Sequence, residues 1–194
     1  MDTTDPLRRQ ARRAYEAGRL RKALSVAALS IPLLLLAVSC GAGAHLSCLL
    51  EVGLVAAVVA LVWRGEGFGA GAVPGLLAGA LPLAGSLGLR YSVHGPAQHC
   101  DGCHVPFAAC FTATFAGGLL AGAVIAVAAA RLRPEWRSRA IGSAALVAAL
   151  AGSLGCAFFG LTGMLGLWAG VALVGTPALI AFAARAPASS PPGA

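Results

Sequence analysis

Cysteine and histidine are densest in one short segment of this sequence, His99-Cys100-Asp101-Gly102-Cys103-His104. Two cysteines separated by two residues bring their sulfur atoms to one tight turn, and thiolate and imidazole groups together bind zinc or copper. Cys100 and Cys103 supply two ligands of a tetrahedral site. The candidates for the other positions are His94, His99, His104, Cys48 and His45. The segment therefore predicts a zinc or copper site.

The same residues also match the Cys-x-x-Cys-His pattern of c-type haem attachment. In that alternative Cys100 and Cys103 hold the vinyl groups, His104 is the proximal ligand, and Met164 or His45 is the distal one. The segment between Arg90 and Val105 is too short to enclose a haem by itself. Haem c is therefore the weaker of the two cofactor predictions.

Three further cysteines, Cys40, Cys110 and Cys156, are predicted redox-active thiols. In an oxidising compartment an even number of cysteines forms disulfides that tie loops together, and this chain has six. Disulfide formation and metal binding can compete for the same sulfur atoms, so both interpretations stay open.

Glu51 lies a few residues inside an apolar run, one turn from Cys48 and two from His45, and we expect the three on roughly one helical face. An ionisable group inside a membrane span is costly, which makes it a candidate for function. Glu51 is thus a predicted metal ligand or proton acceptor. The alternative is a carboxylate solvated at the level of the lipid headgroups.

The composition places these residues in a membrane protein. The 194-residue chain is 58% hydrophobic and 11% charged, with a mean hydropathy of +0.82, which is too apolar for a soluble domain. Its 26 glycines allow helices to approach closely in lipid. We predict an all-α polytopic bundle of about six transmembrane helices. The expected spans are residues 24–39, 46–63, 70–89, 105–130, 140–159 and 161–184.

Basic residues alternate between the ends of these spans. Seven of the fourteen precede the first span, and the others at the same ends are Arg64, Arg131, Arg133, Arg137, Arg139 and Arg185. The opposite ends carry only Arg90. By the positive-inside rule both termini are cytoplasmic, and we expect the inner membrane of a bacterium. All six cysteines and all four histidines then belong to the outer face.

The N-terminus predicts a short basic helix over residues 6–22, since Asp5-Pro6 is a typical helix start. We expect an N-terminal cytoplasmic helix (1–23), a transmembrane domain (24–185) and a disordered tail (186–194). The predicted partner-binding residues of the helix are Arg8, Arg9, Arg12, Arg13 and Tyr15. Its partner is a cytoplasmic protein or the anionic leaflet, with no direct nucleic acid contact, although the cluster could serve topology and lipid anchoring alone.

A second interpretation of the N-terminus is a lipoprotein signal ending in Leu36-Ala37-Val38-Ser39-Cys40. Ala37 fits that pattern poorly, and five further spans follow. The chain contains no phosphate-binding loop, GxSxG or HExxH motif, so we do not expect an enzyme.

In architecture the chain resembles the NrsF-type membrane anti-sigma factors of proteobacteria. Locally the resemblance rests on Gly79-Ala80-Leu81 leading through Leu89-Arg90-Tyr91-Ser92-Val93-His94, and on cysteines near Pro106 and at Cys156. It implies an N-terminal segment that holds an extracytoplasmic-function sigma factor, and outer cysteines that sense metal or oxidants and release it. Cys100 or Cys103, with Cys156, would be the sensing thiols.

These observations predict a membrane sensor with an outer cluster that responds to metal or redox state. One alternative is a metal transporter or uptake accessory that uses Glu51 and the outer thiols as an entry site. Apart from Glu51 the spans offer no ligands along such a path, which weighs against transport. The other alternative is a haem-carrying electron-transfer subunit.

Overall fold

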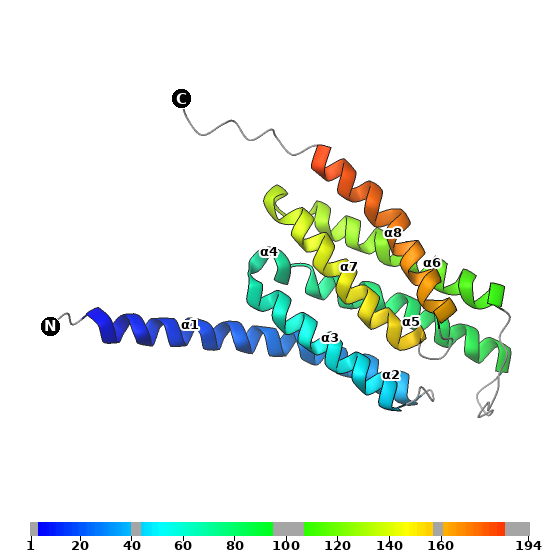
Figure 1. The fold of residues 1–194 in the computed structure, drawn as a ribbon, viewed down its shortest axis with the longest axis horizontal. Helices are drawn as coiled ribbons and strands as arrows, with labels where there is room; N and C mark the ends of the chain where they lie inside the picture. The colour runs from blue at the N-terminus through cyan, green and yellow to red at the C-terminus, as the bar shows by residue number, and fades with distance from the viewer. Residues whose placement is uncertain (1–3, 40–43, 95–106, 157–160, 185–194) are drawn as a thin grey trace.

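The computed structural model describes residues 4–39, 44–94, 107–156 and 161–184, and the regular structure in these ranges is helical throughout (Figure 1). This confirms the predicted all-α fold. The elements, in chain order, are α1 (Thr4–Ala27), η1 (Ala28–Ser30), α2 (Ile31–Ser39), α3 (Ala44–Arg64), α4 (Glu66–Gly69), α5 (Ala72–His94), α6 (Phe107–Ala130), α7 (Pro134–Cys156) and α8 (Leu161–Ala184).

Among the described residues, four helices are long and apolar enough to cross a membrane, which is the character of a membrane protein. The four apolar stretches are Ser47–Arg64, Glu66–Gly85, Phe111–Ala130 and Gly163–Phe182. Large apolar side chains on their outer surfaces are exposed, such as Leu49 (70%) and Leu173 (60%). Such a surface is suited to lipid rather than to water.

The first expected span, residues 24–39, is not one regular helix. It comprises the end of α1, the 3₁₀ turn η1 and the nine-residue α2. Pro32 explains the interruption, because proline has no N–H to donate to the carbonyl four residues earlier and its ring crowds that carbonyl. The Ile31 N–H accordingly bonds to Ala28 O, three residues back.

The fifth expected span, residues 140–159, lies within α7 up to its last residue, Cys156. This helix starts earlier than expected, at Pro134. Its first two turns carry Glu135, Arg137 and Arg139 and are therefore too polar for a membrane interior. The uncharged part of the helix begins at Ala140.

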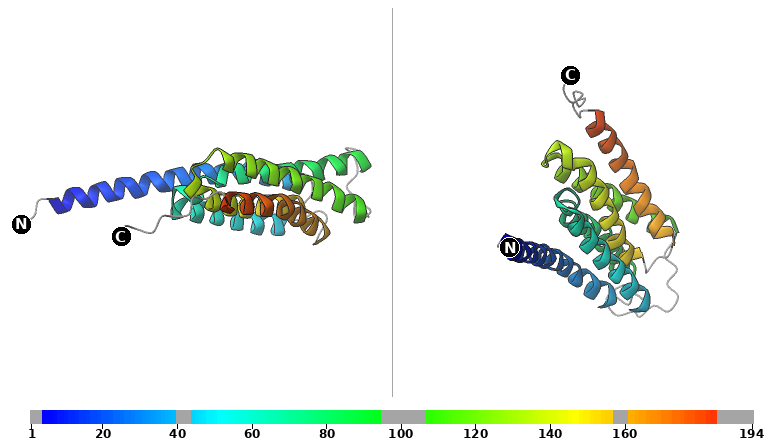
Figure 2. Two further views of the ribbon diagram at one scale, coloured as in Figure 1. Left: turned by 90° about the horizontal axis from the view of Figure 1, so that it is seen from above. Right: turned by 60° about the vertical axis from the view of Figure 1, so that its left-hand side comes forward.

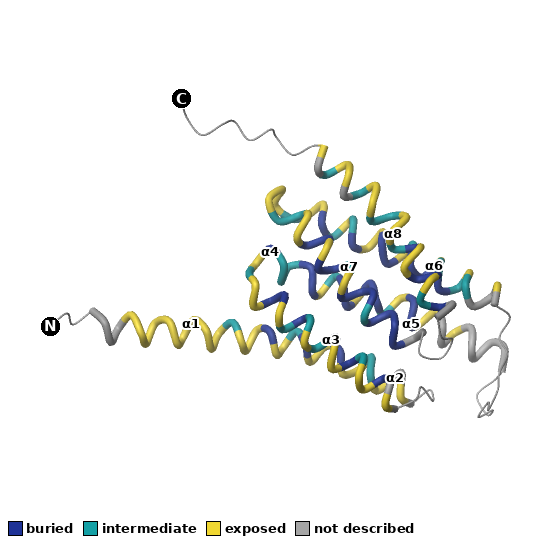
Figure 3. The backbone as a smooth tube through the Cα atoms, in the orientation of Figure 1, coloured by how far each residue is buried: buried dark blue, intermediate teal, exposed yellow. Residues whose placement is uncertain are grey.

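The bundle is built from neighbouring helix pairs. Helix α5 packs against α6 and α7, α8 packs against α6 and α7, and α3 packs against α1 and α7 (Figures 1 and 2). The N-terminal part of α1 extends beyond the bundle. Residues 8–18 of this extension are exposed, and Figure 3 shows that the buried residues lie where the helices face one another.

Small residues bring α5 and α7 into close contact. Gly75 and Gly79 of α5 and Gly71, which directly precedes this helix, recur every four residues and so line one side. A Cβ atom on Gly75 would lie 2.7 Å from Ala144 O and 2.8 Å from the Val147 Cβ. The backbones of the two helices can therefore approach this closely only because glycine lacks a side chain.

Helices α6 and α8 meet in the same way. A Cβ atom on Gly170 of α8 would lie 2.5 Å from Phe115 O, and one on Gly118 of α6 would lie 2.6 Å from Leu167 O.

Two apolar clusters fill the remaining interior. One joins α1, α3, α5 and α7 around Leu54, and the other joins α5, α6 and α7 around Ile141.

We expect Gly75→Ala to lower the free energy of unfolding by about 1–3 kcal/mol, because the added methyl group meets the α7 backbone. The matched control is Gly142→Ala, where a Cβ meets nothing within 4 Å. This control should be neutral, or stabilising by up to about 1 kcal/mol through helix propensity. Thermal unfolding in detergent followed by circular dichroism measures both, and equal effects of the two variants would contradict the close α5–α7 contact.

Candidate functional site

The bundle has two chemically different ends. One end of the bundle contains the C-terminal ends of α2, α5 and α7 and the N-terminal ends of α3, α6 and α8 (Figure 1). We call this the Cys/His end. The C-terminal ends of α3, α6 and α8 and the N-terminal ends of α5 and α7 form the opposite, basic end.

Several of the predicted metal and redox residues belong to helix turns at the Cys/His end. His45 and Cys48 lie on the first turns of α3 and are both exposed, and Cys48 is not in a disulfide. His94 ends α5, Cys110 is in the first turn of α6, and Cys156 ends α7. The other predicted residues lie outside the described residues, namely Cys40, His99, Cys100, Cys103 and His104.

In the part of the chain that the structure describes, no three histidine, cysteine or acidic side chains are close enough to hold a metal ion. The Cys-x-x-Cys segment is outside that part. The zinc, copper and haem hypotheses therefore stay predictions from the sequence.

Glu51 differs in burial from His45 and Cys48, the two residues expected to lie on roughly the same face of the helix. Glu51 is only 7% exposed, whereas the other two are exposed. The reason is helix geometry, because each step of three residues turns the side chain by about 60° from the previous one. Glu51 is two such steps from His45, so it lies on the buried side of α3 whereas His45 lies on the exposed side.

The buried side of α3 forms a small polar cluster with the first helical segment, which we call the Ser/Glu cluster: Ser30, Ser47 and Glu51. Ser30 and Ser47 are 0% exposed. The Ser30 hydroxyl is hydrogen bonded with Glu51 Oε1 and lies 2.7 Å from Ala27 O. Ser47 Oγ and Glu51 Oε2 are buried without a hydrogen-bond partner.

Sequence reasoning singled out Glu51 but missed both serines. Ser47 could have been identified from the sequence, because it precedes Glu51 by four residues and so lies on the same face of the helix. Ser30 is twenty-one residues from Glu51, and only the crossing of the two helical segments brings them together.

Arg19 attaches α1 to the basic end of α3. Its guanidinium donates to Val62 O at 3.5 Å and to Trp63 O, and it lies 5.7 Å from the ring centroids of both Tyr15 and Trp63. Carbonyl oxygens at the end of a helix lack intrahelical donors, so a cation there is favourable. Arg19 is not among the residues that the sequence predicted to be functional.

Further arginines at the basic end lie on aromatic rings. The Arg139 guanidinium is 5.9 Å from the Phe68 ring centroid, and that of Arg137 is 5.2 Å from the Phe182 centroid. Arg137 also donates to Leu132 O at 3.1 Å. These contacts place the α3–α5 connection, the start of α7 and the end of α8 together. The basic segments predicted to share one membrane face thus share one end of the bundle.

The N-terminal extension, residues 4–18 of α1, is the basic arm, and its residues 8–18 are exposed. Arg8, Arg9, Arg12 and Arg13 are all exposed, and Tyr15 is 66% exposed. Arg12 Nε lies 2.9 Å from Glu16 Oε1, one turn later on the surface. The predicted partner-binding side chains of the arm are therefore accessible.

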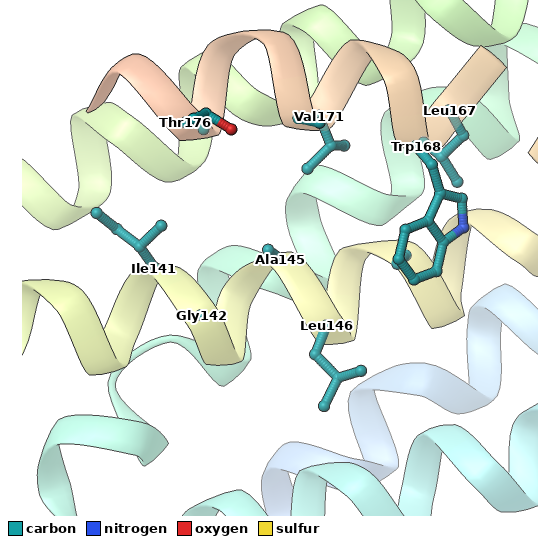
Figure 4. Close-up of a pocket in the computed structure, with 11 residues that line it drawn as sticks. Ile141, Gly142, Ala145, Leu146, Leu167, Trp168, Val171 and Thr176 are labelled. Atoms are coloured by element: carbon teal, nitrogen blue, oxygen red, sulfur yellow. The ribbon is translucent and has the colours of Figure 1, made fainter. Parts of the chain in front are cut away.

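An apolar groove of about 340 Å³ lies between α7 and α8 (Figure 4). Leu146, Trp168 and Val171 are among its lining residues, and Thr176 is its one hydroxyl side chain. The lining offers neither a charge nor a metal ligand. Its chemistry suits a hydrocarbon chain rather than a polar substrate.

Searches of protein-family models, curated proteins and solved structures found no match to this chain. The function is therefore inferred from the chain's own residues and their arrangement. The features available for this are the Cys/His end, the basic arm and the Ser/Glu cluster between them.

We expect Arg19→Ala to loosen the attachment of α1 to α3, since it removes the contacts to the α3 carbonyls and to two aromatic rings. The interaction free energy lost between α1 and α3 is on the scale of two cation–π contacts of about 0.5–1 kcal/mol each. The measurement is the distance distribution between spin labels at Ala14 and Arg64. It should broaden in Arg19→Ala and be unchanged in the control Arg13→Ala, which alters the exposed arm. An unchanged distribution in Arg19→Ala would remove Arg19 as the anchor.

Proposed function

We propose that the protein is a six-span membrane sensor and not an enzyme. Thiols and imidazoles at the Cys/His end respond to zinc, copper or oxidants, and the basic arm engages a regulatory protein at the other face. The observation that carries this proposal is the continuous segment from α1 through η1 to α2. It links the basic arm to the Cys/His end within one span.

The proposed six spans are the α1–α2 segment together with α3, α5, α6, α7 and α8. Residues 24–39 and 140–156 are short for this purpose, since at 1.5 Å per residue they cover roughly 24–26 Å of the ~30 Å hydrocarbon core. Local bilayer thinning accommodates spans of this length. The gathering of the arginine contacts at one end supports a cytoplasmic basic end.

In this arrangement both termini are cytoplasmic and the Cys/His end faces the periplasm of a bacterium. A metal bound by Cys100 and Cys103, or a disulfide from one of them to Cys156, would change how the ends of α5, α6 and α7 meet. Helix α7 packs on α3, and α3 packs on α1, so such a change has a contiguous path to the arm.

The proposed partner is a sigma factor of the extracytoplasmic-function class, as the resemblance to NrsF-type anti-sigma factors implies. The exposed arginines of the arm suit an acidic protein surface. Charged side chains on such a helix contribute to association rate and specificity, so the interaction should weaken as salt concentration rises.

The topology makes a direct prediction for reporter fusions in a bacterial host. Green fluorescent protein fused after residue 65 or after residue 133 should be fluorescent, and alkaline phosphatase at these positions inactive. Fusions after residue 97 and after residue 158 should show the reverse. Active phosphatase after residue 133 would contradict a cytoplasmic basic end.

The sensor proposal predicts that the full-length protein retains a sigma factor and releases it when zinc, copper or an oxidant is added. Cys100→Ser with Cys103→Ser should abolish release while retaining the partner. Deletion of residues 2–14 should abolish retention, and Arg131→Ala, which leaves the arm intact, is the control. The measurement is co-purification together with transcription of the neighbouring genes. Unchanged regulation after the deletion would exclude the anti-sigma role.

A further inference from the structure

The apolar groove between α7 and α8, which we call the α7–α8 groove, is lined by small residues on both sides. Gly142 and Ala145 lie on α7, and Ala172 and Gly175 lie on α8. A Cβ atom on Gly142 or Gly175 would meet nothing within 4 Å, in contrast to the glycines that bring α5 against α7. Gly142 and Ala172 are also exposed, so the groove opens on the outer surface of the bundle.

The groove has about the length of one lipid leaflet. Its lining residues on α7 run from Ile141 to Ala149, which corresponds to about 12 Å of helix. The hydrocarbon core of a bilayer is ~30 Å thick, so one leaflet covers about 15 Å. Ile141 and Thr176 lie at one end of the groove, and Trp168 lies at the other (Figure 4). An acyl chain aligned with α7 would therefore occupy the groove within one leaflet.

Arg137 lies at the Ile141 end of the groove. It precedes Ile141 by four residues and so shares its side of α7. Its guanidinium is 5.2 Å from the ring centroid of Phe182 on α8, and Phe182 packs against the apolar cluster that contains Ile141. Arg137 thus connects α7 with α8 where the groove meets the basic end.

The Arg137 guanidinium is held in place and can still bind an anion. It donates to Leu132 O at 3.1 Å and to Ala130 O at 3.2 Å. An arginine carries five N–H donors, so these two bonds leave donors for a phosphate group. The segment 131–137 also contains two exposed arginines, Arg131 and Arg133, and one glutamate, Glu135. The charge at this end of the groove is therefore positive.

We propose that the α7–α8 groove binds one acyl chain of an anionic phospholipid whose phosphate is bound by Arg137. Arg131 and Arg133 add positive charge around the headgroup. A basic pocket beside transmembrane helices is the usual form of a site for anionic lipid headgroups. The proposal rests on the placement of α7 and α8 as membrane spans, and it does not depend on sensing by the thiols or on the basic arm.

Charge favours a lipid over a second copy of the chain as the occupant. Two copies with the same orientation in a membrane have their basic ends in the same leaflet. A symmetric dimer through the groove would therefore bring the Arg137 regions of both copies together. Like charges at such an interface are unfavourable, whereas a phosphate neutralises them.

The test uses Trp168, which lines the groove and is 55% exposed. Trp63→Phe and Trp136→Phe remove the other tryptophans and keep an aromatic ring beside Arg19 and Arg133. The full chain is placed in phosphatidylcholine nanodiscs that contain a minor share of phosphatidylglycerol. Bromine atoms are carried either by the phosphatidylglycerol chains or by an equal amount of phosphatidylcholine. We expect brominated phosphatidylglycerol to quench Trp168 fluorescence several-fold more strongly.

Three variants locate the site. Arg137→Gln should lower the preference for phosphatidylglycerol by about fivefold, the contribution of one arginine near an anionic lipid. Arg139→Gln is the matched control and should keep the preference, because Arg139 contacts Phe68 instead. Gly142→Leu should remove the excess quenching, since leucine fills the groove and its Cβ meets no neighbour within 4 Å.

Equal quenching by the two brominated lipids would overturn the inference, because Trp168 would then contact only bulk lipid. Weak quenching by both would also overturn it, and a dimer in mass photometry that Gly142→Leu dissociates would then identify a second copy as the occupant. The comparison of the two lipids requires no groove variant to fold. The reporter fusions test the spans separately, so an incorrect topology is distinguished from the absence of this lipid site.

Discussion

The rest of the structure depends on close contact between helices that have no hydrophobic force to bring them together in lipid. Glycine supplies this contact at α5–α7 and at α6–α8, where an added Cβ atom would collide with backbone of the opposite helix. Because these four helices are fixed so closely, the ends of α5, α6 and α7 that carry His94, Cys110 and Cys156 are held at one end of the bundle. The predicted metal or redox chemistry at that end therefore depends on glycines, which have no reactive side chain.

The first part of the chain is attached by different forces. Helix α1 is bonded to α3 by Arg19 at the basic end, and η1 is bonded to it through Ser30 and Glu51. The glycine contacts belong instead to α5–α8. Polar contacts depend on protonation, salt and water far more than a glycine contact does. The attachment of the segment that carries the basic arm is thus sensitive to chemical conditions.

Much of this architecture could be predicted from the sequence. Hydropathy located the helices to within a few residues, as with the expected span 70–89 and the observed α5 (Ala72–His94), and it singled out Glu51. The break at η1 was missed although Pro32 signals it. The pairing of Glu51 with Ser30 and the anchoring role of Arg19 could not be predicted, because each joins residues far apart in sequence. Such contacts depend on how two helices cross, which hydropathy does not encode.

The two attachments of the first segment have a mechanical consequence. Arg19 fixes α1 where it leaves the bundle, and the Ser30–Glu51 contact fixes the same segment about three turns further along. If the inner contact is lost, Arg19 still holds α1 where it leaves the bundle, and the apolar packing of Ala23 and Ala27 is the remaining constraint between Arg19 and η1. A rotation of α1 about Arg19 then moves the basic arm and the η1 end of α1 in opposite directions. Because α1 is a continuous helix from Thr4 to Ala27, the arm transmits this movement without a flexible joint. A small displacement inside the bundle is thereby converted into a displacement of the arm.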